Sequence, residues 1–233
     1  MPEKGKSMKK HIVIGIEGFV GAGKTSICRE LLKQDPEAIL LNGGNLYRAI
    51  VYTLMKKESN LLKLKRLTKN IDIKQCMEDL KVEIRIEDRE SKIYIEGVLA
   101  NEEDLQSKAS SLAVSIVGGM ADNTRLFAFA KELIDTLKKE HNVIVSGRSL
   151  MKIYPEMDYH LFITASLNER VKRKCIQYEG KETEKEVKKN IIKRDRLQKL
   201  AGFYKISKNT ITIDVTDCSS VQESTKKVLN YLK

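Results

Sequence analysis

The chain has 233 residues, of which 41% are hydrophobic and 32% charged, and its formal net charge is +11. This length fits one α/β domain, or one with an insertion. No apolar run reaches the roughly 20 residues of a membrane-spanning helix, and no secretory signal core follows the basic N-terminus. We therefore expect no membrane partner and a cytoplasmic location. The positive charge fits attraction to nucleotides or a merely lysine-rich surface, and we do not expect nucleic acid because the lysines lack interleaved aromatic residues.

The N-terminal part of the chain alternates short apolar runs with helical patterns. Residues 11–16 form a continuous apolar run of the kind that makes a buried parallel strand. A glycine-rich turn follows, and then a predicted helix from about Lys24 to Lys33. A second short strand over Ala38–Leu41 leads into a predicted turn at 42–44, and a helix is expected to restart near Leu46.

The middle of the chain changes its hydrophobic period. Residues 55–80 are lysine-rich and helical in pattern. Valine and isoleucine then alternate with charged residues over 82–95, which predicts a half-buried antiparallel hairpin. A hairpin within α/β alternation indicates an insertion. A long helical stretch is predicted from about Glu102 to Glu140, with an interruption near Gly118 and Gly119.

The last third of the chain returns to alternating strands and helices. The sequence predicts three more core strands at 143–146, 160–164 and 210–215, a charged helical segment over 167–200, and a final amphipathic helix over about 221–232. This alternation indicates a parallel sheet with helices on both faces. Ligands bind such sheets beyond the carboxyl ends of the strands, where the motifs described next are found.

The segment directly after the first strand reads GFVGAGKT and matches the phosphate-binding pattern GxxxxGK[ST] in full. Its glycines allow the backbone to wrap closely and point N–H groups at phosphate oxygens. Lys24 is expected to reach the β- and γ-phosphates, and the Thr25 hydroxyl to coordinate Mg²⁺. Glu17, just before the loop, is expected either to hold a magnesium-bound water or to accept hydrogen bonds from the loop. The predicted cofactors are thus ATP and Mg²⁺, and the residues predicted to bind them are Gly18, Gly21, Ala22, Gly23, Lys24, Thr25 and Ser26.

Several further segments, in their order and spacing, resemble the cytidylate kinase family. The phosphate loop IEGFVGAGKTS resembles the family's IDGPxGSGKST, and NGGNLYR at 42–48 resembles D-[ST]-G-A-x-Y-R. IVSGRS at 144–149 resembles the start of the family's DGRDIGTxVFPDA segment. LFITASLNERVKR at 161–173 is similar to hFLTASxExRAxRR, and the RD at 194–195 resembles that of the family's lid.

This resemblance implies a fold, since it runs from about His11 to Leu232. The expected structure is a single P-loop kinase domain over 1–233: a five-stranded parallel sheet flanked by helices, a hairpin-containing insertion that binds the monophosphate, and a helical lid. A monomer is also implied. The expected bounds are about 10–54, 112–165 and 205–233 for the core, about 55–111 for the insertion, and about 167–202 for the lid.

The resemblance also implies a reaction, in which ATP gives its γ-phosphoryl group to a nucleoside monophosphate, with CMP or dCMP the leading acceptor. Such transfer depends mainly on positioning and charge neutralisation. Guanidinium groups suit this task because they stay charged and bind phosphate bidentately. The residues expected to bind the acceptor are Tyr47, Arg48, Arg125 and Arg148. The residues expected to act on the transferred group are Lys24, Arg148, Arg173 and Arg194, with Arg170 a further candidate beside the lid.

The sequence departs from the family pattern at several positions. Ser146 and Ser149 stand where the family has acids, and neutral residues replace polar or charged ones at Asn42, Gly43, Ala113, Gln198 and Ala201. The lost acids leave open a nucleotide-binding module without transferase activity. The altered acceptor positions leave open a kinase for a different small acceptor.

Overall fold

The computed structural model describes residues 11–58, 60–68, 72–107, 110, 113–114, 124–204 and 206–232. The predicted interruption near Gly118 and Gly119 lies outside the described residues. Within the described part, no helix is both long enough and apolar enough to span a bilayer.

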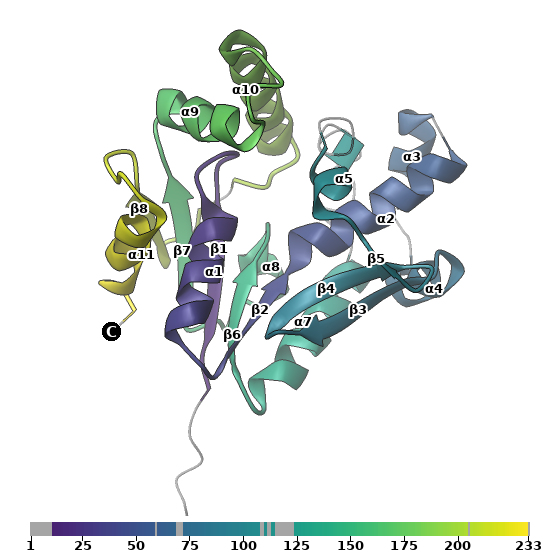
Figure 1. Ribbon diagram of the computed structural model, residues 1–233. Helices are drawn as coiled ribbons and strands as arrows, with labels where there is room; N and C mark the ends of the chain where they lie inside the picture. Colours follow the sequence, from purple (N-terminus) through teal and green to yellow (C-terminus); the bar gives the residue numbers. More distant parts are fainter. Residues whose placement is uncertain are drawn as a thin grey trace, which may run out of the picture.

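A twisted sheet forms the centre of the fold, with strands in the order β3-β4-β2-β6-β1-β7-β8 and β5 paired to β4 (Figure 1). The five adjacent strands from β2 to β8 in this order pair in parallel, as predicted. Every residue of β1 is buried, because helices cover the sheet on both faces. The five strands are β2 (Ala38–Asn42), β6 (Asn142–Ser146), β1 (Val13–Gly18), β7 (Tyr159–Thr164) and β8 (Thr210–Asp214).

Alternate residues of the strands pack against different pairs of helices. Ile14 and Ile16 of β1 join the apolar cluster formed with α1 (Lys24–Gln34) and α11 (Val221–Leu229). Val13 joins a second cluster with α7 (Thr124–Lys138) and α8 (Leu150–Ile153). Because successive strand residues point to opposite faces, the two helix pairs cover opposite sides of the sheet. Figure 1 shows α1 and α11 side by side.

The predicted hairpin is present, and it extends the central sheet instead of standing apart from it. Strands β3 (Val82–Glu87) and β4 (Glu90–Ile95) pair antiparallel around a turn in which Asp88 and Arg89 both have positive φ. The short β5 (Val98–Leu99) continues from β4. The Leu40 N–H donates to the Arg89 carbonyl at 2.8 Å, and β4 pairs with β2 in parallel. The eight-stranded sheet is therefore mixed, with the antiparallel hairpin at one end and parallel strands from β2 to β8.

Four helices pack with the hairpin around one apolar cluster: α2 (Gly43–Lys57), α3 (Leu61–Thr68), α4 (Ile73–Asp79) and α5 (Glu102–Gln106). The sequence predicted a turn at 42–44 and a helix from Leu46, which was wrong, since α2 begins at Gly43 directly after β2. Glycine lowers helix propensity, but burial of Leu46 and Ile50 in this cluster holds the first turn in place.

Helices α9 (Leu167–Gln177) and α10 (Glu184–Leu200) form the region predicted as a lid (Figure 1). Helix α10 begins with a capping box in which Thr183 and Glu186 exchange hydrogen bonds. Val171 and Ile191 pack with Val20 of the phosphate loop in a separate apolar cluster. The two helices therefore rest directly on the loop. The residue bounds of core, insertion and lid stay a prediction.

Candidate active site

The phosphate loop connects β1 to the N-terminus of α1, as its motif predicts. Gly18, Gly21 and Gly23 all have positive φ, a conformation that only glycine adopts readily. A Cβ at Gly18 would lie 2.1 Å from the Ile163 carbonyl oxygen, so no side chain fits where the loop crosses β7. The loop backbone therefore takes the tight path that a phosphate cradle needs.

Lys24 lies half-buried at the bottom of this loop. Its Nζ donates to the carbonyl oxygens of Gly18, at 2.8 Å, and Phe19, at 2.7 Å. Burial holds the pKa of Lys24 well below its usual value, and the positive charges of Arg148, Lys174, Arg48 and Arg194 lower it further. Five cationic side chains from five parts of the chain thus converge on one place.

A cavity of about 680 Å³ lies over the loop. Most of the predicted site residues line it, and the basic groups face one another with few acids between them. Glu102 and Glu169 are the acidic residues in its described lining. The predicted residues that line it are Gly21, Gly23, Lys24, Thr25, Ser26, Arg48, Arg148, Arg173 and Arg194.

Two of these arginines, the half-buried Arg48 and the buried Arg194, are not fully paired among the described residues. Arg48 Nε and Arg194 Nε have no hydrogen-bond partner among the described residues. Burial lowers the pKa of Arg48 to about 9, and Arg194 and Arg148 add repulsion. Burial also lowers the pKa of Arg194. Unpaired buried cations are costly unless an anion joins them, so this arrangement favours an anionic ligand.

A second, smaller cavity of about 110 Å³ adjoins the first and shares Arg48, Arg148 and Arg194 with it. The buried hydroxyl of Tyr47 has no partner among the described residues and also belongs to this lining. The remaining walls are mainly apolar and come from α2, α7, α8 and the segment after α10: Leu46, Leu126, Phe127, Ala130, Ile134, Leu150, Ile153 and Phe203. An apolar recess bordered by cations fits a ligand with an uncharged body and a phosphate.

Neutral side chains stand in the site at the positions where the family has acids. Ser146, at the end of β6, lines the large cavity, and Ser149 lines the small one with a φ of 55°. Gln198 accepts a hydrogen bond from Arg148 through its side-chain oxygen. The described residues contain no group of three His, Cys, Asp or Glu side chains able to hold a metal ion.

Glu17 makes a contact that the sequence reasoning did not predict, and its holding of a magnesium-bound water stays a prediction. Its Oε1 accepts a hydrogen bond from the Leu150 backbone N–H, at the start of α8, and lies 3.6 Å from His160 Nε2. Glu17 therefore helps to hold the turn that carries Arg148. No local pattern indicates this contact, because the partners are 133 residues apart.

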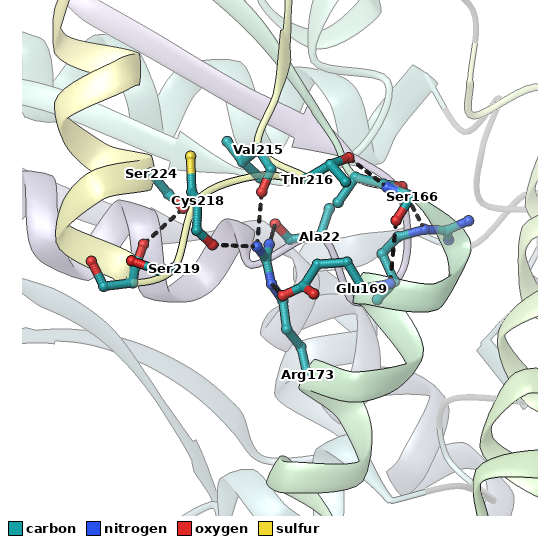
Figure 2. Close-up of polar contacts among 12 residues, drawn as sticks. Ala22, Ser166, Glu169, Arg173, Val215, Thr216, Cys218, Ser219 and Ser224 are labelled. Carbon is teal, nitrogen blue, oxygen red and sulfur yellow. Dashed lines mark hydrogen bonds and ion pairs between the residues drawn. The ribbon is translucent and has the colours of Figure 1, made fainter.

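Arg173 is held by backbone groups (Figure 2). Its guanidinium donates to the carbonyl oxygens of Ala22 at 3.3 Å, Val215 at 2.8 Å and Cys218 at 3.3 Å, and to Glu169 Oε1 at 2.9 Å. These contacts join α9 to the phosphate loop and to the segment between β8 and α11. Arg173 borders the cavity but is occupied in this conformation, and its role at the transferred group stays a prediction.

We expect Arg173→Ala to destabilise the nucleotide-free protein by about 2 kcal/mol, since hydrogen bonds to a charged group contribute about 1.5–3 kcal/mol. Denaturant unfolding measures this loss. Arg196→Ala, at an exposed position of α10, is the matched control and should leave stability nearly unchanged. Unaltered stability in Arg173→Ala together with a large fall in kcat would instead assign Arg173 to the reaction.

Arg125 and Arg170 are not among the residues that line the large cavity with the converging cations. The Arg125 side chain is 65% exposed, and its Nη1 lies 3.4 Å from Asp72 Oδ2. Arg170 is buried and binds Val20 O at 3.1 Å and Asp195 Oδ2 at 2.5 Å. Arg170 thus supports the phosphate loop, and acceptor binding by Arg125 stays a prediction.

Lys174 is a site residue that the sequence reasoning missed. It lines the large cavity beside Arg173. Burial, followed by repulsion from Arg194 and Arg48, lowers the pKa of Lys174 to about 8. The only available signal was its place in the basic run RVKRK, which is also typical of a solvated helix face.

This low pKa predicts that the protein's affinity for phosphate ligands falls at alkaline pH. Only the protonated amine attracts an anion, and the free enzyme loses that proton as pH rises through about 8. We therefore expect kcat/KM for the phosphate substrates to decline above this pH. Lys174→Met should lower kcat/KM at pH 7 and remove this alkaline limb, and an unchanged limb in the variant would assign it to another group.

Three features define a P-loop kinase. These are a glycine loop between a buried strand and a helix, parallel strands that carry this loop, and a pair of cation-bearing helices over it. The family model for cytidylate kinase matches residues 14–233. The chain therefore belongs to the cytidylate kinase family, and it is an enzyme of the nucleoside monophosphate kinase class.

Individual relatives are distant but span the whole length. A cytidylate kinase of Alkaliphilus oremlandii is 26% identical over 95% of this chain and 98% of its own length. One of Aquifex aeolicus is 27% identical over 94% of this chain and 95% of its own. A thymidylate kinase structure from Candida albicans covers 96% of this chain and 91% of its own, at 12% identity and a TM-score of 0.44, which is too slight a likeness to carry an argument.

Proposed function

We propose that this enzyme transfers the γ-phosphoryl group of ATP to a nucleoside monophosphate, with CMP or dCMP as acceptor, and releases ADP and the nucleoside diphosphate. The observation that carries the proposal is the convergence of Lys24, Arg48, Arg148 and Arg194 where the two cavities meet. Two phosphate groups placed end to end at this border would neutralise these charges. Phosphoryl transfer needs this arrangement more than it needs covalent help from the protein.

The larger cavity suits the donor. Loop N–H groups, the N-terminus of α1 and Lys24 would bind the β- and γ-phosphates. The Thr25 hydroxyl, also in the lining, would hold Mg²⁺, with phosphate and water oxygens as its other ligands, which matches the preference of this ion. Mg²⁺, when bound, would supply neutralisation of the negative charge on the phosphates. Ser146 can order a water there but adds no charge.

The smaller cavity suits the acceptor. At about 110 Å³ it is too small for a whole nucleoside, so its apolar walls would receive only part of the nucleoside, with Arg48 and Arg148 binding the monophosphate at its inner border. The free Tyr47 hydroxyl offers one further hydrogen bond to this ligand. We also propose, from the family resemblance, that the enzyme acts as a cytoplasmic monomer on small nucleotides alone.

One observation favours a second candidate, a kinase for a different small acceptor. Ser149 and Gln198, which line the small cavity, replace acidic family residues. Turnover with CMP, dCMP, UMP, AMP and GMP, each at several concentrations, tests acceptor choice. The highest kcat/KM with CMP or dCMP supports the first candidate, and a clearly higher value with another monophosphate supports the second.

A further inference from the structure

Tyr204 lies in the middle of a continuous chain of polar contacts between the phosphate loop and Arg148. Its hydroxyl is 2.9 Å from Asp195 Oδ1 and also contacts Gln198 Oε1. That same Gln198 oxygen accepts a hydrogen bond from Arg148 Nη1. Because an arginine only donates, the amide oxygen must face Arg148, which fixes the orientation of the Gln198 side chain.

The other end of this chain is the phosphate loop itself. Asp195 accepts from the Val20 N–H at 3.4 Å and pairs with Arg170, which in turn donates to the Val20 carbonyl. The aromatic ring of Tyr204 packs edge-on against that of Phe19, with centroids 4.9 Å apart. Movement of the loop backbone on binding phosphate would therefore reach both the hydroxyl and the ring of Tyr204.

The hydroxyl can take two discrete states. It carries one hydrogen, and two acceptors, Asp195 and Gln198, compete for it. Gln198 is 2% exposed, so its amide cannot turn to solvent for a replacement partner. When Tyr204 donates to Gln198, it helps to hold the oxygen that orients Arg148. When it donates to Asp195, that support is lost.

We propose that Tyr204 is a positioning residue that couples occupancy of the phosphate loop to the orientation of Arg148 toward the acceptor. The inference rests on the proposed function, because it assumes a donor at the loop and an acceptor phosphate at Arg148. It predicts that donor and acceptor bind cooperatively and that the Tyr204 hydroxyl carries much of this coupling. Coupling between two sites on one protein is commonly about 5- to 150-fold in affinity.

The test compares CMP binding with and without a saturating non-hydrolysable ATP analogue and Mg²⁺, by calorimetry on the wild type and Tyr204→Phe. The variant keeps the ring against Phe19 and removes only the hydroxyl. We expect the analogue to tighten CMP binding about fivefold or more in the wild type and less than about twofold in the variant. Affinity for the analogue alone should change less than twofold. Tyr231→Phe, 45% exposed near the C-terminus, is the matched control and should retain the full coupling.

A double-mutant cycle with Gln198→Ala completes the test. If the hydroxyl acts through Gln198, the coupling lost in the double variant will equal that lost in either single variant. Full coupling in Tyr204→Phe, additive losses in the cycle, or no coupling in the wild type would each overturn the proposal. Failure of the proposed function gives a different result, namely no binding of any nucleoside monophosphate to the wild type.

Discussion

Lys24→Ala is expected to lower kcat about 10²- to 10³-fold, the usual loss on removing one preorganised stabiliser of transition-state charge. Lys24 lies half-buried among four other cations at the bottom of the phosphate loop, where the transferred phosphoryl group would lie. The fold should survive, since the substitution removes a charge that its neighbours repel. Steady-state kinetics at saturating ATP and acceptor measure the effect, with thermal unfolding as a check on folding.

Lys33→Ala is the matched control for this change. Lys33 lies on the same helix, exposed beside Glu30, and its loss should leave kcat within about twofold of wild type because exposed pairs contribute little. Wild-type activity in Lys24→Ala would contradict the assignment of the phosphate loop as the donor site.

Arg48→Ala is expected to reduce kcat/KM for the acceptor about 10- to 100-fold, with little change in KM for ATP. A hydrogen bond to a charged group contributes about 1.5–3 kcal/mol, and each 1.4 kcal/mol is about a tenfold change. Arg48 lies at the border of the two cavities, and its buried Nε has no partner among the described residues, so its best available partner is a ligand phosphate. Arg48→Lys should restore only part of the activity, since an ammonium cannot bind bidentately.

Arg48→Ala is expected to lower activity but not the stability of the protein. Burial and two neighbouring arginines lower the pKa of Arg48 to about 9, so the charged group is held in the folded state at a cost. Removing it should leave the Tm of the nucleotide-free protein unchanged or raised. Arg85→Ala, on the exposed face of the hairpin, is the control. A marked drop in Tm together with unchanged acceptor kinetics would show that Arg48 serves only the fold.

The parts of the fold that local patterns specify were predictable from the sequence. The apolar runs around Ile14, Leu40 and Ile144 placed the buried parallel strands, and GxxxxGK[ST] placed Lys24 and Thr25, because these signals depend on residues adjacent in the chain. The hairpin was also predicted, but its pairing with β2 was not, since a hydrogen bond between the backbones of Leu40 and Arg89 leaves no trace in side-chain periodicity.

Which arginines bind the protein itself and which keep an unpartnered nitrogen could not be predicted from local patterns. Arg170, Arg173 and Arg194 are equally basic in sequence, yet the first two bind backbone carbonyls and only Arg194 keeps a buried, unpartnered nitrogen. Which guanidinium is free depends on carbonyl groups brought close by folding. The low pKa of Lys174 likewise arises from burial and from charges elsewhere in the chain.

The measurement that tests the central claim most directly is transfer of labelled γ-phosphate from ATP·Mg²⁺ to a nucleoside monophosphate by the purified protein, with products separated and counted. We predict label in the nucleoside diphosphate, one ADP formed for each, no ADP without acceptor, and loss of both products in Lys24→Ala. ATP binding without transfer to CMP, dCMP, UMP, AMP or GMP would contradict the assignment as a nucleoside monophosphate kinase.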